Sequence, residues 1–266
     1  MELKVNDCTV FAATGGKPFD ASLPVIVFVH GAAADHTVWK LQTRYFAWHG
    51  HSVLAIDMPG HGRSDGPCLP TIDALADWVI AVVDAAGLKT VSLVGHSAGS
   101  LVTLDAAARY PDRIDHLALL GCAFPMRVND VLLDSSKAND GLANHLTNSW
   151  GYGRAAQRGR HTIPGLWIMK GSLRLLESAD DGVLYNDMNA CHIYNGGDTA
   201  AQNIACPTLS IMGERDMMTP LKLTRKTASQ IKDVCEVVIP GAGHFMQDEA
   251  PDATLNALRD FLPVPG

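Results

Sequence analysis

Short apolar runs recur along the chain and predict the strands of a sheet. Val25–Val29 is a continuous run of β-branched and aromatic residues, which is typical of a strand that is buried on both faces. Five further runs of this kind follow it: Ser52–Asp57, Thr90–Gly95, His116–Gly121, Thr208–Gly213 and Cys235–Pro240. The more polar residues 2–13 predict a hairpin at the edge of the sheet.

Segments with helical spacing separate these runs. They are Val38–Trp48, Thr71–Ala86, Ser97–Tyr110, Leu221–Ile231 and Ala253–Phe261. Strands that alternate with helices are joined by right-handed crossovers and so form a parallel sheet. We therefore predict an α/β fold with a mostly parallel central sheet flanked by helices.

One long stretch interrupts this alternation, because residues 123–205 have helical patterns and no convincing strand. An insertion between two strands of such a sheet would cover their carboxyl ends, where ligands bind in open α/β sheets. We therefore predict a core formed by residues 1–122 and 206–266, with residues 123–205 as a helical cap. The candidates for substrate contact in this cap are Trp150, Tyr152, Trp167 and Tyr185.

Ser97 stands between a predicted strand and a predicted helix, in the sequence Gly95-His96-Ser97-Ala98-Gly99. A tight strand-to-helix turn forces its central residue into a strained backbone conformation, and small neighbours relieve the resulting crowding. Such a turn exposes the serine hydroxyl and aims the Ala98 N–H at a developing oxyanion. Ser97 is therefore the predicted nucleophile.

A serine nucleophile needs a base, and the best of the eleven histidines is His244, in a glycine-rich loop after the last predicted strand. The base in turn needs a carboxylate that fixes its tautomer and stabilises the imidazolium. Asp216 follows the preceding strand at a suitable distance, whereas its rival Glu214 lies very close to the strand end. The predicted triad, in chain order, is Ser97, Asp216 and His244.

The loop after the first apolar run is expected to supply the second oxyanion donor. Gly31 allows a sharp turn there, so that the N–H of Ala32 faces the site, with Ala33 as a possible substitute. His30 also lies in this turn and is a candidate both for ordering the loop and for contacting substrate. Asp57, after the second run, reads as a structural turn residue that binds backbone N–H groups or Arg63.

Together these features resemble the α/β-hydrolase superfamily over nearly the whole chain. The resemblance also rests on Trp39, Asp57-x-Pro59-Gly60-His61-Gly62-x-Ser64, Gly213-x-x-Asp216 and Gly243-His244. It implies the α/β-hydrolase fold and acyl transfer without a cofactor: Ser97 attacks a carbonyl, His244 carries the proton, and water releases the acyl group. Haloalkane dehalogenases and epoxide hydrolases have aspartate in place of Ser97, whereas esterases, C–C hydrolases, hydroxynitrile lyases and cofactor-free haloperoxidases keep the serine.

We expect a carboxylic ester hydrolase for a small to medium apolar substrate, because an apolar cap favours a closed, water-poor pocket. One alternative is a C–C bond hydrolase of an aromatic-ring fission product, with a substrate carboxylate bound by Arg154, Arg158, Arg160 or Arg174. Another alternative is a ligand-binding protein on a hydrolase scaffold, because a scaffold does not prove a function. If neither ester nor C–C substrate is cleaved, an amide, lactone or thioester is the next test.

Composition limits the classes of partner that we expect. The 266 residues are 47% hydrophobic and carry a formal charge of −7, which disfavours nucleic acid and anionic membrane surfaces. No apolar run is long enough to span a bilayer, and the first residues do not resemble a secretory signal. Six cysteines without paired spacing predict reduced, mostly buried thiols and a cytoplasmic location. We expect a small-molecule substrate, no metal and no cofactor, and we leave a homo-oligomer open.

Overall fold

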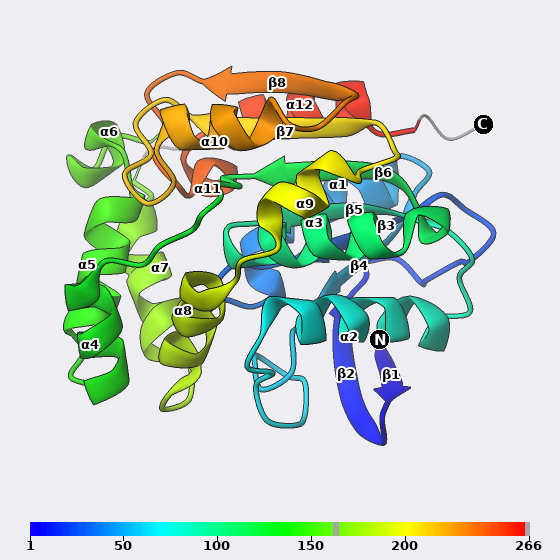
Figure 1. Ribbon diagram of the computed structural model, residues 1–266, viewed down its shortest axis with the longest axis horizontal. Coiled ribbons are helices and arrows are strands. Elements are labelled where there is room, and N and C mark those ends of the chain that lie inside the picture. Colours follow the sequence, from blue (N-terminus) through cyan, green and yellow to red (C-terminus); the bar gives the residue numbers. More distant parts are fainter. Residues whose placement is uncertain (162–164, 264–266) are drawn as a thin grey trace.

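The centre of the molecule is an eight-stranded sheet in a computed structural model that describes residues 1–161 and 165–263 (Figure 1). The strand order is β1-β2-β4-β3-β5-β6-β7-β8, in which β3 to β8 are parallel and the β1–β2 hairpin joins β4 antiparallel. The bounds are Glu2–Val5 (β1), Cys8–Ala13 (β2), Val25–Val29 (β3), Ser52–Ile56 (β4), Val91–His96 (β5), Ile114–Leu120 (β6), Thr208–Gly213 (β7) and Val234–Ile239 (β8). The predicted edge hairpin and the six predicted parallel strands are confirmed.

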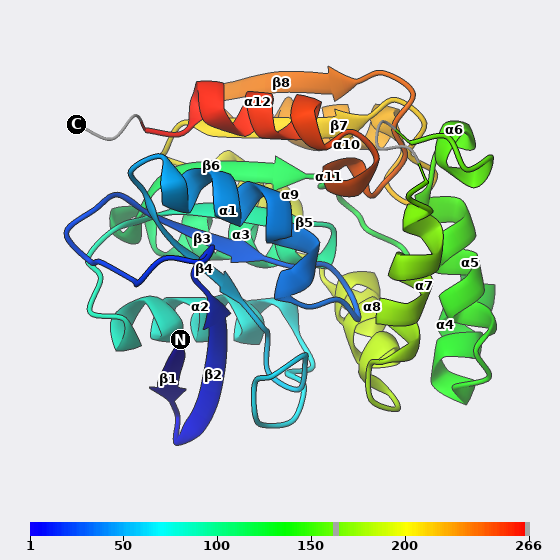
Figure 2. The ribbon, with the colours of Figure 1, turned by 180° about the vertical axis from the view of Figure 1, so that it is seen from behind.

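Helices cover both faces of this sheet. One face carries α2 (Ile72–Ala85), α3 (Ala98–Arg109), α9 (Gly197–Gln202) and α10 (Leu221–Ala228), which lie in front in Figure 1. The other face carries α1 (Lys40–Trp48), α11 (Met246–Glu249) and α12 (Pro251–Phe261), seen from behind in Figure 2. Two short 3₁₀ helices, η1 (His36–Trp39) and η2 (Pro111–Arg113), precede α1 and β6.

Strand β3 explains why the sheet needs two helical layers. Its odd-numbered residues, such as Val27, pack in the hydrophobic cluster of α2 and α3. Its even-numbered residues, Ile26 and Phe28, pack in the cluster of α1 and α12 on the other face. All five side chains are buried, and each contributes roughly 1.5–3 kcal/mol relative to exposure to water.

Two predicted helices differ from the observed ones. The range Val38–Trp48 divides into η1, which Asp35 caps by accepting the N–H of Thr37, and α1. The range Leu221–Ile231 is helical only to Ala228. The N–H of Ser229 still bonds four residues back, to Arg225, but the next two bond three residues back: Gln230 to Thr227 and Ile231 to Ala228. Such tighter bonding is common at helix ends.

Between β6 and β7 the described residues form helices and no strand. We call α4 (Asp130–Ala138), α5 (Leu142–Gly151), α6 (Arg154–Gln157), α7 (Ile168–Glu177) and α8 (Val183–Ile193) the cap helices. They lie together at the end toward which β6 and β8 point (Figures 1 and 2). The following helix, α9, packs on α3 with Ala200 and Ala201 in the core cluster, so the C-terminal part of the 123–205 range packs with the core.

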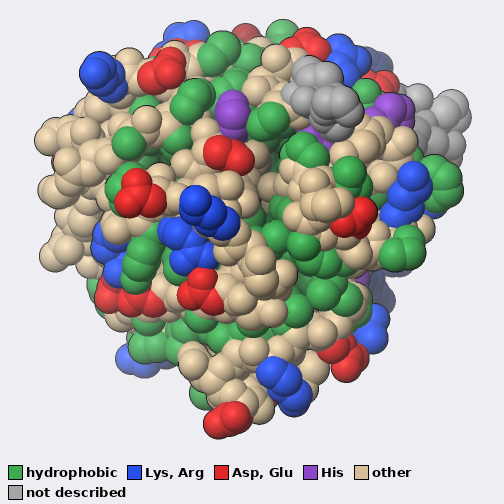
Figure 3. Space-filling model, turned by 90° about the vertical axis from the view of Figure 1, so that its right-hand side faces the viewer, with side chains coloured by type: hydrophobic (Ala, Val, Ile, Leu, Met, Phe, Trp, Pro, Cys, Tyr) green, Lys and Arg blue, Asp and Glu red, His purple; other side chains and the backbone are tan. Residues whose placement is uncertain are grey.

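Membrane helices, surface charge and cysteines are the features that the sequence used to limit the classes of partner. Within the described residues, no helix is both long and apolar enough to cross a membrane. Figure 3 shows the side away from the cap helices, where cationic and anionic side chains are interspersed rather than gathered by sign. All six cysteines are free, as predicted; Cys122, Cys191 and Cys206 are buried, and Cys235 is exposed.

Candidate active site

The candidate site lies where the strand order reverses. β3 pairs with β4 on one side and with β5 on the other, and ligands bind at the carboxyl ends of strands at such a point. A cavity of about 320 Å³ opens there, between the strand ends and the cap helices. Its walls include Ser97, His244 and Ala32 from core loops, with Trp150 and Met188 from cap helices.

Ser97 has the strained backbone that the sequence predicts, with φ 54° and ψ −120°. Its N–H donates to the carbonyl of Leu120 at 2.9 Å, which holds the turn against β6. A Cβ at Gly95 would collide with Thr103 and the backbone of Gly99, and one at Gly99 would collide with the carbonyl of His30. Both positions therefore have to be glycine for the turn to form.

His244 and Asp216 form a buried pair beside this turn. The Nδ1–H of His244 donates to Oδ2 of Asp216 at 2.8 Å, so that Nε2 is left to take a proton. The hydroxyl of Thr219 donates to the same Oδ2 at 2.6 Å, and the N–H groups of Met218 and Thr219 donate to Oδ1. Burial alone would raise the pKa of Asp216, but His244 and these hydrogen bonds hold it below its ordinary value.

The rival acid, Glu214, has a different partner. Its side chain is exposed and accepts the N–H of Gly241 at 2.9 Å. Asp216, two residues later, is the carboxylate that reaches His244. The histidine loop crosses close above the end of β7, since a Cβ at Gly213 would collide with the carbonyl of Gly243.

The histidine loop is also tied to the cap helices, which sequence reasoning missed. The N–H of His244 donates to the carbonyl of Gly151, the last residue of α5, at 2.6 Å. The carboxylate of Glu249 accepts the N–H groups of Gly153 and Gly243, each at 2.8 Å. Burial raises the pKa of Glu249 to about 7. The only sequence signal was a glutamate six residues after a glycine of the loop, which is too common to single out.

The two residues expected to supply oxyanion donors line the cavity beside Ser97. They are Ala98, the first residue of α3, and Ala32, in the loop after β3. The proposed substitute for Ala32 is not free, because the N–H of Ala33 donates to Oδ2 of Asp187 in α8 at 2.9 Å. Geometry therefore favours Ala32 over Ala33 as an oxyanion donor.

His30 orders its loop, and it is not among the described residues that line the cavity. It is fully buried; its Nδ1–H donates to the carbonyl of Gly31 at 2.8 Å, and its Nε2 accepts the N–H of Met58 at 3.0 Å. Burial lowers its pKa to about 4 and keeps it neutral. His96 is buried too, with its pKa lowered to about 3 by burial and by His244, and it donates to the carbonyl of His244.

The four aromatic candidates of the cap divide into one that lines the cavity and three that lie elsewhere. Trp150 lines the cavity. Tyr152 is buried against Phe245, which lines the cavity, with ring centroids 4.9 Å apart. Trp167 is 56% exposed at the start of α7, and Tyr185 lies beneath the ammonium group of Lys137.

The cationic candidates of the cap also lie away from the cavity. Arg154, Arg158, Arg160 and Arg174 do not line it. Among the described lining residues, the one Lys, Arg, Asp or Glu is Arg127, in the connection between β6 and α4, and it donates to the carbonyl of His192 at 2.9 Å. Sequence reasoning missed Arg127, because an isolated arginine in a loop carries no pattern.

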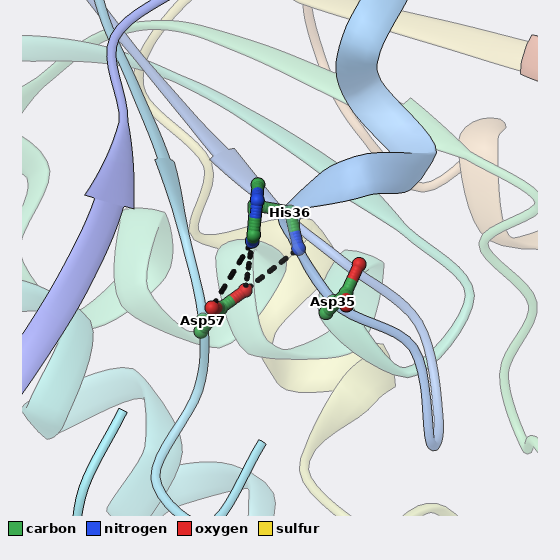
Figure 4. A group of neighbouring side chains, drawn as sticks. All are labelled: Asp35, His36 and Asp57. Carbon is green, nitrogen blue, oxygen red and sulfur yellow. Dashed lines mark hydrogen bonds and ion pairs between the residues drawn. The ribbon is translucent and has the colours of Figure 1, made fainter. Parts of the chain in front are cut away.

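Among the described residues, one group of three side chains of the types that bind metal ions lies close together: Asp35, His36 and Asp57 (Figure 4). Asp57 accepts the backbone and ring N–H groups of His36 at 2.7 and 2.9 Å, and the N–H of Arg63 at 2.9 Å. Asp35 caps η1 through Thr37. The two carboxylates thus order the loops after β3 and β4, and Asp57 is the structural turn residue that the sequence indicates.

Comparisons with known proteins find hydrolases among the proteins to which this chain is similar. A bifunctional esterase/perhydrolase from Acinetobacter calcoaceticus is 28% identical over 267 residues, covering 92% of this chain and 93% of that protein. An (E)-2-((N-methylformamido)methylene)succinate hydrolase from Acinetobacter baylyi is 25% identical and covers 89% of each chain. The crystal structure of the enol-lactonase from Burkholderia xenovorans superposes with a TM-score of 0.84 over 98% of this chain, at 22% identity.

The family model described as the alpha/beta hydrolase family matches residues 26–257, a range that runs from β3 into α12 and includes Ser97, Asp216 and His244. The expected fold class is thereby confirmed, and the two relatives described above are named as a hydrolase and an esterase/perhydrolase. This chain belongs to the alpha/beta hydrolase family and is an α/β-fold hydrolase.

Proposed function

We propose that this protein hydrolyses carboxylic esters of small to medium, mainly apolar substrates through an acyl-enzyme on Ser97. The observation that carries the proposal is that Ser97 and the His244–Asp216 pair meet at one mainly apolar cavity. A strained serine that lines a cavity, together with a histidine that a buried carboxylate orients, is the arrangement that nucleophilic acyl transfer needs.

In the first step, Oγ of Ser97 attacks the ester carbonyl while Nε2 of His244 accepts the hydroxyl proton. Asp216 stabilises the imidazolium that forms, and the N–H groups of Ala32 and Ala98 stabilise the oxyanion. His244 then returns the proton to the leaving alcohol. In the second step water attacks the acyl group, and His244 transfers its proton to Ser97, which regenerates the enzyme.

The cavity supports the choice of substrate class. Its volume of about 320 Å³ lies at the lower end of the range for small-molecule sites. Its wall is mainly apolar and includes Leu132, Trp150, Met188 and Phe245. The similarity to an esterase/perhydrolase, at 28% identity, favours the same bond type.

A second candidate is a substrate that carries a carboxylate, including the C–C bond substrates considered above. Arg127 favours it, because it is the one Lys or Arg among the described residues that line the cavity, and one of its N–H groups donates to the carbonyl of His192 at 2.9 Å. Two relatives are named as hydrolases of substituted succinates, which carry carboxylates. Arg127, and not one of the four cap arginines that the sequence suggests, would then bind the substrate carboxylate.

Initial rates separate these candidates. The parent protein and Ser97→Ala are compared on p-nitrophenyl butyrate, on a p-nitrophenyl succinate monoester, and on a vinylogous diketone ring-fission product. We expect the butyrate ester to be cleaved by the parent and not by Ser97→Ala. Turnover that survives in Ser97→Ala contradicts the triad, and a preference for the anionic ester that Arg127→Gln abolishes favours the second candidate. A parent that is inert in every assay and to a fluorophosphonate favours a ligand-binding role.

A further inference from the structure

One carboxylate oxygen of Asp187, in cap helix α8, accepts hydrogen bonds from two different loops of the core. This oxygen, Oδ2, accepts the Nε2–H of His61, from the loop after β4, at 2.8 Å. The same Oδ2 accepts the N–H of Ala33, from the loop after β3, at 2.9 Å. Both side chains of the ion pair are 2% exposed. The carboxylate therefore joins three segments that are far apart in the sequence.

Both ring nitrogens of His61 face acceptors. Its Nδ1 lies 3.0 Å from the carbonyl of Pro59 and its Nε2 lies 2.8 Å from the carboxylate, an arrangement that favours the protonated ring. Burial alone would lower the pKa of His61, but Asp187 raises it overall. The neutral ring of His30 and the carboxylate of Asp57 also face this pair.

The anchored residue, Ala33, has a conformation that the chain does not adopt by itself. Its φ is 49°, in the left-handed region, which costs a residue other than glycine of order 1–3 kcal/mol unless its surroundings hold it. Ala33 is 1% exposed and packs with Leu132, Val183 and Met188 of the cap helices. Its neighbour Ala32 lines the cavity.

We propose that Asp187 is a positioning residue for the oxyanion hole: by fixing Ala33 to α8, it sets the direction of the adjacent Ala32 N–H. The inference rests on the proposed acyl transfer, in which Ala32 stabilises the oxyanion. Helix α8 also supplies Met188 and Cys191 to the cavity wall, so one helix carries both a substrate surface and the anchor of an oxyanion donor.

Three variants test this role. Asp187→Asn keeps an oxygen for the Ala33 N–H. The double variant Asp187→Leu/His61→Leu removes both charges together, so that no buried charge stays unpaired, and leaves the Ala33 N–H without an acceptor. Asn186→Ala is the matched control. It removes a bond from the same helix to the carbonyl of Leu69 and a longer one, at 3.3 Å, to Oδ1 of Asp187, but it leaves in place Oδ2, the oxygen that accepts the N–H of Ala33.

The readouts are kcat and KM for p-nitrophenyl butyrate, and Ki for a trifluoromethyl ketone, whose adduct with the serine carries an oxyanion. Loss of one oxyanion donor lowers kcat by about 10²–10³-fold. For the double variant we expect kcat to fall by a factor between about 10 and about 10³. Ki should rise by a similar factor, and KM should stay within about 3-fold of the parent value. Asp187→Asn and Asn186→Ala should stay within about 3-fold of the parent in all three quantities.

A double variant that unfolds cooperatively but keeps the parent kcat and Ki overturns the proposal, because Asp187 is then only a structural link. If that variant does not fold, Asp187→Ser decides in the same way, since its hydroxyl is too short to reach Ala33. The proposed function is tested separately by the parent. A parent that neither turns over esters nor is labelled at Ser97 by a fluorophosphonate contradicts the acyl-transfer mechanism and the inference together.

Discussion

Oε1 of Glu249 accepts the N–H of Gly243 at 2.8 Å, one residue before His244. The second oxygen of the same carboxylate accepts the N–H of Gly153, at the junction of α5 and α6. The position of the candidate base thus depends on the cap helices as well as on β8. A substrate that moves these helices would also move His244.

This carboxylate predicts a pH dependence of stability. Burial raises the pKa of Glu249 from 4.5 to about 7 in the folded protein. Between these values the folded state binds more protons than the unfolded state, so the contribution of Glu249 is fully present below pH 4.5 and is lost as the pH rises through about 7. We expect the urea midpoint of the parent to fall relative to that of Glu249→Gln between pH 5 and pH 8. A constant or rising difference contradicts this expectation.

Thr219 donates its hydroxyl to the carboxylate oxygen that His244 uses. Thr219→Val keeps the volume and removes this bond, and a hydrogen bond to a charged group is worth about 1.5–3 kcal/mol. We expect kcat on p-nitrophenyl butyrate to fall about 10-fold or more, with KM nearly unchanged. Thr219→Ser should restore most of the rate. Equal kcat values for the Val and Ser variants would show that the hydroxyl does not orient Asp216.

Gly99 packs against the backbone of β3 and His30 so closely that a Cβ would collide with two carbonyl groups. Gly99→Ala should cost at least about 1–3 kcal/mol of stability and displace the turn that carries Ser97. Gly171, in α7, faces open space, and Gly171→Ala should instead stabilise the protein by roughly 0.5–1 kcal/mol. Chemical denaturation measures both changes. A Gly99→Ala variant as stable and active as Gly171→Ala is the contrary result.

Trp150 and Trp167 were equal candidates in the sequence, and the structure separates them. Trp150 lines the cavity, whereas Trp167 is 56% exposed. Trp150→Ala enlarges the cavity and should raise kcat/KM for octanoate relative to acetate by about 10-fold or more across the p-nitrophenyl ester series. Trp167→Ala should leave the profile unchanged. Two identical profiles would mean that Trp150 does not limit acyl length.

The sequence predicts those parts of the candidate site that depend on local backbone geometry or on the topology of the sheet. The turn at Ser97 needs Gly95 and Gly99 beside it, so strand, turn, glycines and helix all appear in one short stretch. Asp216 and His244 follow neighbouring parallel strands, and the parallel topology alone brings such loops to one edge of the sheet.

The missed residues are those that act across the boundary between the core and the cap helices. Asp187 reaches Ala33 across 154 positions, and Glu249 reaches Gly153 across 96. Neither contact leaves a local periodicity or motif, because it depends on how the cap helices pack on the core. His30 was ambiguous for a related reason: its role depends on Met58 from another strand end.

In the proposed mechanism Ser97 is the nucleophile and the His244–Asp216 pair activates it. Reaction with a fluorophosphonate, followed by intact mass and peptide mapping, tests it most directly. We predict one adduct per chain on Ser97, no adduct in Ser97→Ala, and labelling slowed by about 100-fold or more in His244→Ala, in line with loss of a general base. Labelling of Ser97→Ala at the parent rate, or an adduct on another residue, would contradict the account.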